Sequence, residues 1–178
     1  MTARKMVNKG FTLVEILIVV VILGILAAIV IPQFTSASEA ANLSSATTQL
    51  QSIRSQLELY QLQHNGNYPP STSSDAFWEQ LTSETDDLGT VVTDGSGFGP
   101  YLPKRVQNPL NNNSSDIVTV ADTATTFAAS GSNTAGFAYQ ASTGEIRAFV
   151  SEARFDKLGL DEADGDFLEY GAAAPAGN

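Results

Sequence analysis

The chain has 178 residues, with 19 acidic and nine basic side chains, a formal net charge of −10, one histidine and no cysteine. The lack of cysteine excludes disulfides and cysteine-ligated zinc, and a single histidine argues against His-rich metal sites and a Ser/His/Asp triad. The acidic balance argues against nucleic-acid binding through a basic surface. Three of the nine basic residues, Arg4, Lys5 and Lys9, fall within the first ten positions, so the remainder is strongly acidic.

The first predicted element is an apolar helix. Between Phe11 and Ile31 only Thr12 and Glu15 are polar, and these 21 residues would reach about 30 Å as a helix, the thickness of a bilayer core. A removable secretory signal, with an apolar region of roughly 7 to 15 residues, is the alternative. Basic residues precede the apolar stretch and none follows it before Arg54, so the positive-inside rule predicts a cytoplasmic start and a periplasmic or extracellular remainder.

Two features of this apolar helix need an explanation. A carboxylate within a bilayer costs free energy, so Glu15 either reaches the headgroups near the positive helix N-terminus or meets a cation from a partner chain. Proline at position 32 removes the amide that would donate to the carbonyl of Ala28. We therefore expect the helix to be weakened between Gly24 and Pro32.

The residues around the start of the helix carry a family resemblance. The run Lys9-Gly10-Phe11-Thr12-Leu13-Val14-Glu15, after a basic leader and before an apolar run to Pro32, resembles the class III signal of type IV pilins and type II secretion pseudopilins. The resemblance implies that a prepilin peptidase cuts between Gly10 and Phe11 and that Phe11 is N-methylated. It also implies that Glu15 pairs with the Phe11 amine of a neighbouring subunit, and that the segment from Gly24 to Pro32 loses helical form in the filament.

A second helical pattern follows. Apolar residues recur at steps of three and four, which predicts one stripe packed on a sheet, with a short coiled coil as the alternative; they are Leu43, Ala46, Leu50, Ile53, Leu57 and Tyr60. Arg54 and Glu58 stand at i and i+4, where a weak pair is expected. The helix should end at Asn65-Gly66, before Pro69-Pro70.

The rest of the chain is expected to form a small globular head. A short helix is expected at 75–81, capped by Ser74, with Phe77, Trp78 and Leu81 facing inward. Strand candidates are 90–93, 117–120, 125–128, 136–141 and 145–150, the last two forming a hairpin. The predicted fold class is α+β: a long N-terminal helix, half membrane-spanning and half amphipathic, packed on a small antiparallel β-sheet head in the pilin-like manner.

Five segments follow from these patterns and from the resemblance. They are a leader peptide at 1–10, a transmembrane and filament-core helix at 11–34, an amphipathic helix at 35–65, a periplasmic globular head at 66–170 and a flexible tail at 171–178.

Short motifs in the head, including Gly66-Asn67-Tyr68-Pro69 and Asn108-Pro109-Leu110, resemble major pseudopilins of type II secretion. Two departures qualify the comparison. The chain lacks the cysteines that close a loop in many type IVa pilins. It also lacks the Ser-Trp-Asp calcium loop common in major pseudopilins, because its only tryptophan is Trp78.

Calcium binding is suggested separately by the acidic stretch near the C-terminus. Asp161, Asp164 and Asp166 offer the oxygen ligands that calcium prefers. Their spacing fails the EF-hand pattern. A solvated acidic turn is the alternative interpretation.

These patterns and the resemblance together predict a filament subunit rather than an enzyme: a single-pass inner-membrane protein that polymerises into the pseudopilus of type II secretion. Expected partners are further copies of the chain, minor pilin-like subunits, prepilin peptidase and an inner-membrane assembly platform. The alternatives are a type IV pilin for adhesion, motility or DNA uptake, a monomeric anchored periplasmic binding protein, and an anchored hydrolase that uses carboxylates.

Overall fold

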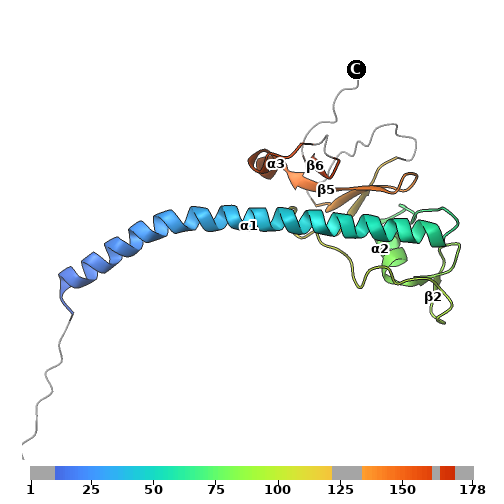
Figure 1. Cartoon of the computed structure of the whole chain (residues 1–178), viewed down its shortest axis with the longest axis horizontal. Helices are drawn as coiled ribbons and strands as arrows, with labels where there is room; N and C mark the ends of the chain where they lie inside the picture. The colour runs from blue at the N-terminus through green and yellow to red at the C-terminus, as the bar shows by residue number, and fades with distance from the viewer. Residues whose placement is uncertain (1–10, 122–133, 162–164, 171–178) are drawn as a thin grey trace, which may run out of the picture. The chain divides into compact units, whose positions relative to one another are not determined.

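The computed structural model describes residues 11–121, 134–161 and 165–170 (Figure 1). The predicted leader, the predicted strand at 125–128 and the predicted tail lie outside these residues. The chain divides into two compact units, Met1–Glu39 and Ala40–Asn178.

Helix α1, Leu13–Gln63, contributes to both units. In the first unit its large apolar side chains are exposed all round, from 41% at Val30 to 82% at Leu13. Among the described residues it is the one helix that is long and apolar enough to cross a membrane. A helix that is apolar on every side needs lipid or other protein chains around it.

In the second unit α1 buries one face only. The buried residues are the predicted stripe, Ala46, Leu50, Ile53, Leu57 and Tyr60, with Leu43 partly buried beside them. The stripe shares one hydrophobic core with the main sheet, so the predicted packing on a sheet is confirmed. Beyond Gln63 the backbone turns left-handed at Asn65 and Gly66, with φ of 56° and 85°, which confirms the predicted helix end.

The main sheet contains four strands in the order β3-β4-β5-β6, of which Figure 1 labels β5 and β6. Their bounds are β3 Ile117–Thr119, β4 Phe137–Gln140, β5 Glu145–Ser151 and β6 Phe167–Tyr170. Strands β4 and β5 form the predicted antiparallel hairpin. The α+β fold class is therefore confirmed.

The outer strands correct one part of that prediction. Strand β3 pairs with β4 in parallel, and β6 pairs with β5 in parallel, so the sheet is mixed rather than purely antiparallel. Parallel neighbours need a crossover of about a dozen residues or more. Residues 120–136 and 152–166 provide that length, and the second of these contains helix α3, Glu152–Leu158, which the sequence did not predict.

Helix α2, Ser74–Thr82, lies close to its predicted position and buries Phe77, Trp78 and Leu81. The predicted cap at Ser74 is wrong by one residue. The Ser73 hydroxyl oxygen accepts from the amide of Ala76, whereas the Ser74 hydroxyl oxygen accepts from the amide of Ile117 in β3. A two-stranded sheet follows, in which β2, Val91–Val92, pairs with an unpredicted β1, Glu84–Thr85.

Candidate functional site

Thr12 determines where α1 begins. Its side-chain Oγ1 accepts from the amide of Glu15 at 3.2 Å, and its carbonyl accepts from the amides of Glu15 and Ile16. A threonine followed three residues later by glutamate is the capping-box spacing, a signal that the sequence contains and that the predictions above do not include. Phe11 therefore precedes the first helical turn, and it is 77% exposed. Gly10 lies outside the described residues.

Glu15 lies in the first turn of α1, and its side chain is exposed. Within the described residues its carboxylate has no ion-pair partner. The positive end of the helix favours a carboxylate at this position, which agrees with one of the two explanations offered from the sequence. The other explanation requires a cation from a second chain.

Helix α1 runs through Gly24 and Pro32 without interruption. Pro32 has no amide to donate to the carbonyl of Ala28. The hydroxyls of Thr35 and Ser36 donate to the carbonyls of Ile31 and Pro32, each at 3.2 Å, and so compete with the regular helical bonds. Loss of helix between Gly24 and Pro32 within a filament stays a prediction, because this chain alone is helical there.

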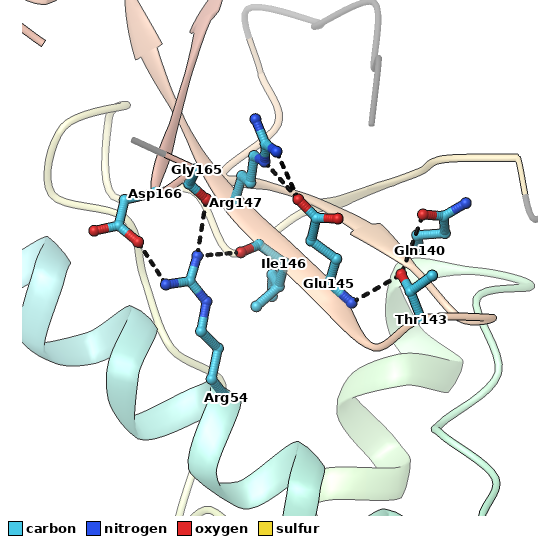
Figure 2. Close-up of polar contacts among 8 residues, drawn as sticks. All are labelled: Arg54, Gln140, Thr143, Glu145, Ile146, Arg147, Gly165 and Asp166. Atoms are coloured by element: carbon cyan, nitrogen blue, oxygen red, sulfur yellow. Dashed lines mark hydrogen bonds and ion pairs between the residues drawn. The ribbon is translucent and has the colours of Figure 1, made fainter. Parts of the chain in front are cut away.

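Asp166, one of the predicted calcium ligands, forms an ion pair with an arginine. Figure 2 shows the Arg54 side chain of α1 reaching the segment before β6: Nη1 lies 2.5 Å from Asp166 Oδ1, and Nη2 donates to the carbonyls of Ile146 at 2.8 Å and Gly165 at 3.1 Å. The expected Arg54–Glu58 pair is therefore replaced by a partner 112 residues away. A guanidinium at this carboxylate competes with any cation for the same oxygen.

The described residues show no arrangement of the other two predicted ligands, Asp161 and Asp164, around a metal. Asp161 is exposed, and Asp164 lies outside the described residues. Across the described ranges, no group of three or more histidine, aspartate or glutamate side chains could hold a metal ion. Calcium binding by Asp161, Asp164 and Asp166 stays a prediction, which calorimetric titration of the full chain with calcium, using Asp161→Asn as a control, would test.

The single histidine connects helix α1 to strand β1. His64 is buried; its Nδ1 lies 2.8 Å from the carbonyl of Tyr60, and its Nε2 lies 2.8 Å from the Thr85 hydroxyl. Because a carbonyl can only accept, Nδ1 donates to it, and the Thr85 hydroxyl is the partner of Nε2. The ring also stacks on Tyr60 with a centroid distance of 3.6 Å. Both ring nitrogens are thus engaged in structural contacts.

Tyr60 is the most strongly perturbed titratable group of this region. Burial, with smaller contributions from Tyr101 and Asp86, raises the pKa of Tyr60 to about 12. Its hydroxyl lies 2.5 Å from Gln80 Oε1, to which it donates. The phenol therefore serves as a neutral donor that links α1 to α2.

Comparison with protein families identifies the N-terminal segment. Residues 5–31 match the family model described as the prokaryotic N-terminal methylation motif. The matched range includes Gly10, Phe11, Glu15 and Gly24. No solved structure shows a significant match to the chain.

Curated relatives named type II secretion system core protein G also match. The chain is 38% identical to that of Aeromonas hydrophila over 111 residues, 61% of this chain and 72% of the relative. It is 43% identical to that of Vibrio cholerae over 97 residues, 54% of this chain and 64% of the relative. It is 48% identical to that of Pseudomonas aeruginosa over 62 residues, 35% of this chain and 43% of the relative.

The matched region thus spans between 43% and 72% of these relatives. Their shared name favours the secretion interpretation over the extracellular pilus. Because the Aeromonas match combines 38% identity with 72% coverage of that relative, the chain belongs to the type II secretion system core protein G family.

Proposed function

We propose that this chain is a pseudopilin, a subunit of the filament whose growth from the inner membrane drives type II protein secretion. The observation that carries the proposal is the methylation motif at residues 5–31, located at the start of a helix that is apolar on every side. The heads would lie on the outside of the polymer. The chain would act mechanically and not as an enzyme.

Processing would begin at Phe11. Prepilin peptidase would cut between Gly10 and Phe11, and Phe11 would then be N-methylated. The position of Phe11 before the first turn supports this, because helical hydrogen bonds do not restrain the backbone there. The new α-amine, with an ordinary pKa near 8, would be cationic at neutral pH, and methylation would keep the charge.

Assembly would use that charge. In an apolar bundle of helices the Phe11 amine of one subunit and the Glu15 carboxylate of its neighbour would attract far more strongly than in water. The desolvation of both groups opposes this gain, so the pair would determine the register of the subunits more than the stability of the filament. The uncleaved leader would block the pair.

The membrane and its machinery complete the proposal. The N-terminus would face the cytoplasm and the head the periplasm, since basic residues precede the apolar segment. The partners would be further copies of the chain, minor pilin-like subunits, prepilin peptidase and an inner-membrane assembly platform.

Mass spectrometry of the N-terminal peptide tests the processing route. Protein purified from its native membrane should begin at Phe11 and carry one methyl group, and both changes should disappear in a strain lacking prepilin peptidase. Glu15→Ala, which leaves Gly10 and Phe11 unchanged, serves as a control that should still be cleaved. An intact leader in wild-type cells, or cleavage near Ala37, would overturn the proposal.

A further inference from the structure

The second unit contains a groove that none of the roles above uses. It lies between α1 and the loop at 102–113, with a volume of about 440 Å³. Its lining combines apolar and polar groups, among them Ser45, Gln49, Leu102, Pro103, Val106 and Pro109. A volume of this size is ample for a few side chains of a partner.

The groove is also basic, on a chain that is otherwise strongly acidic. Lys104 and Arg105 line it, are exposed, and form the one adjacent basic pair after the first ten residues. Arg105 contacts Asp75 at 2.7 Å in a surface ion pair, whereas Lys104 has no ion-pair partner within the described residues. Charge complementarity therefore favours an occupant that joins an apolar side chain to a carboxylate.

Such an occupant is present elsewhere on the same chain. The turn Asp86–Thr90 joins β1 to β2 and presents Leu88, which is 82% exposed, next to an exposed Asp87. The side-chain Oδ1 of Asp86 accepts from the amides of Leu88 at 3.0 Å and Thr90 at 2.7 Å. The amide of Thr90, above all, lowers the pKa of Asp86, so this carboxyl keeps its charge and the turn keeps its shape.

Two side-chain contacts fix the turn on the head. The side-chain amide of Asn65 donates to the carbonyl of Asp87 at 3.3 Å, and that of Gln80 donates to the carbonyl of Gly89 at 2.6 Å. Gly89 has a φ of +82°, and a Cβ there would lie 2.9 Å from the Tyr60 hydroxyl. The turn is therefore ordered before it meets a partner, which reduces the entropic cost of docking.

The turn and the groove lie at different ends of the same stretch of α1. The groove uses Ser45 and Gln49, whereas the turn is bonded to Asn65, just past the helix end. Sixteen to twenty helical residues correspond to about 24 to 30 Å along the axis. The turn of one molecule therefore cannot fill its own groove, but a second copy displaced along the helix axis can supply it.

We propose that the Asp86–Thr90 turn of one copy docks into the groove of the next, with Leu88 against the apolar wall and Asp87 facing Lys104. This inference rests on the proposed filament function. A contact between two different patches of the same molecule can repeat indefinitely, which is the type of interface that builds helical polymers.

Cysteine cross-linking tests the contact without background, because the chain has no cysteine of its own. One tagged copy would carry Leu88→Cys and a second copy Gln107→Cys, an exposed position that lines the groove. Oxidation of native membranes should give a disulfide-linked heterodimer. The matched control replaces Leu88→Cys by Leu62→Cys, which is 81% exposed, lies in the last turn of α1 and should not cross-link.

Charge reversal tests the polar part of the contact. Lys104→Glu and Asp87→Lys should each lower the cross-linking yield about two- to fivefold, the effect expected for an exposed ion pair. Combining the two reversals should restore the yield. Restoration would show that Asp87 and Lys104 pair directly, because combining the two substitutions would not repair general damage to either variant.

Filament formation and methylation of Phe11 are scored in the same cells, so the two proposals can fail separately. Methylated filaments without the Leu88–Gln107 cross-link would overturn the docking contact and leave the pseudopilin proposal intact. Equal cross-linking by the Leu62 control, or linkage of Gln107→Cys to a protein other than this chain, would also overturn the contact. Unprocessed Phe11 without filaments would overturn both.

Discussion

Helix α1 places similar apolar residues in two different surroundings. From Leu13 to Phe34 its large apolar side chains are exposed on every side, whereas from Ala46 to Tyr60 one stripe is almost fully buried against the sheet. The second surrounding is supplied by the chain itself. The first is expected to come from outside the chain, because large exposed apolar surfaces mark sites of contact with a membrane or with other protein chains.

The comparison assigns different roles to the two segments of α1. The buried stripe should determine whether the head folds. The exposed segment should determine where the protein resides and what it assembles with. Substitutions in the two segments of α1 should therefore have effects that do not overlap.

The largest effect is expected from Leu50→Ala. Leu50 is fully buried in the stripe, so truncation leaves a cavity and should lower the free energy of unfolding by about 2–5 kcal/mol. Denaturant unfolding of the full chain in detergent micelles, followed by fluorescence of the buried Trp78, measures it. Leu17→Ala, the same change in the exposed segment, should leave the unfolding midpoint unchanged. An equal loss in both variants would contradict the claim that only the buried stripe of α1 stabilises the head.

Arg54→Ala should come next. It removes the ion pair to Asp166 and the donors to the carbonyls of Ile146 and Gly165, which should cost about 1–3 kcal/mol of unfolding free energy. The control is Arg105→Ala, whose ion pair with Asp75 lies on the surface of the head and whose loss should cost under about 1 kcal/mol. Similar losses in the same unfolding assay would show that Arg54 does not connect α1 to the C-terminal strand.

These variants also bear on how much the sequence could predict. The spacing of apolar residues predicted the buried stripe because helical periodicity is local, and Asn65-Gly66 predicted the helix end for the same reason. The partner of Arg54 could not be predicted in this way. A nearby Glu58 was available at i+4, whereas Asp166 lies 112 residues away in sequence and only the tertiary fold brings it close.

The parallel pairing of β3 with β4, and of β6 with β5, could not be predicted for a related reason. Hairpin signals identify neighbours in sequence, whereas a strand that returns after a crossover carries no local sign of its direction. At the N-terminal site the roles of Phe11 and Glu15 stay predictions from the sequence. The Thr12 cap was predictable as well, because the Thr-x-x-Glu spacing is a local signal, but it was not among the predictions.

Alkaline pH should weaken the head through Tyr60. Its pKa is raised to about 12 in the folded chain against 10.0 for a free phenol, so the folded state retains a proton that the unfolded state loses. The contribution of Tyr60 to the stability of the head should be fully present below pH 10 and should be lost between pH 10 and 12. Thermal unfolding at a series of pH values measures this. Tyr60→Phe should show a shallower fall over that interval, and an unchanged slope would assign the loss to other groups.

The smallest effect is expected at the cap of α2. Ser73→Ala removes the acceptor for the Ala76 amide and should cost about 1 kcal/mol. Ser74→Ala, at the position the sequence favoured as the cap, should cost less, because its hydroxyl oxygen accepts only a 3.2 Å bond from Ile117. Unfolding midpoints of the two variants decide between the caps, and a larger loss for Ser74→Ala would restore the sequence-based assignment.

The most direct test concerns the exposed segment of α1 and its one carboxylate. Glu15→Gln keeps the size of the side chain and removes its charge. We predict normal membrane insertion, cleavage before Phe11 and methylation, with the unfolding midpoint of the head unchanged and filament assembly lost. Sedimentation of sheared filaments, with N-terminal mass spectrometry on the same cells, measures both outcomes. Filaments formed by Glu15→Gln at the wild-type level would contradict the claim that the partner of this segment is another copy of the chain, joined through Glu15.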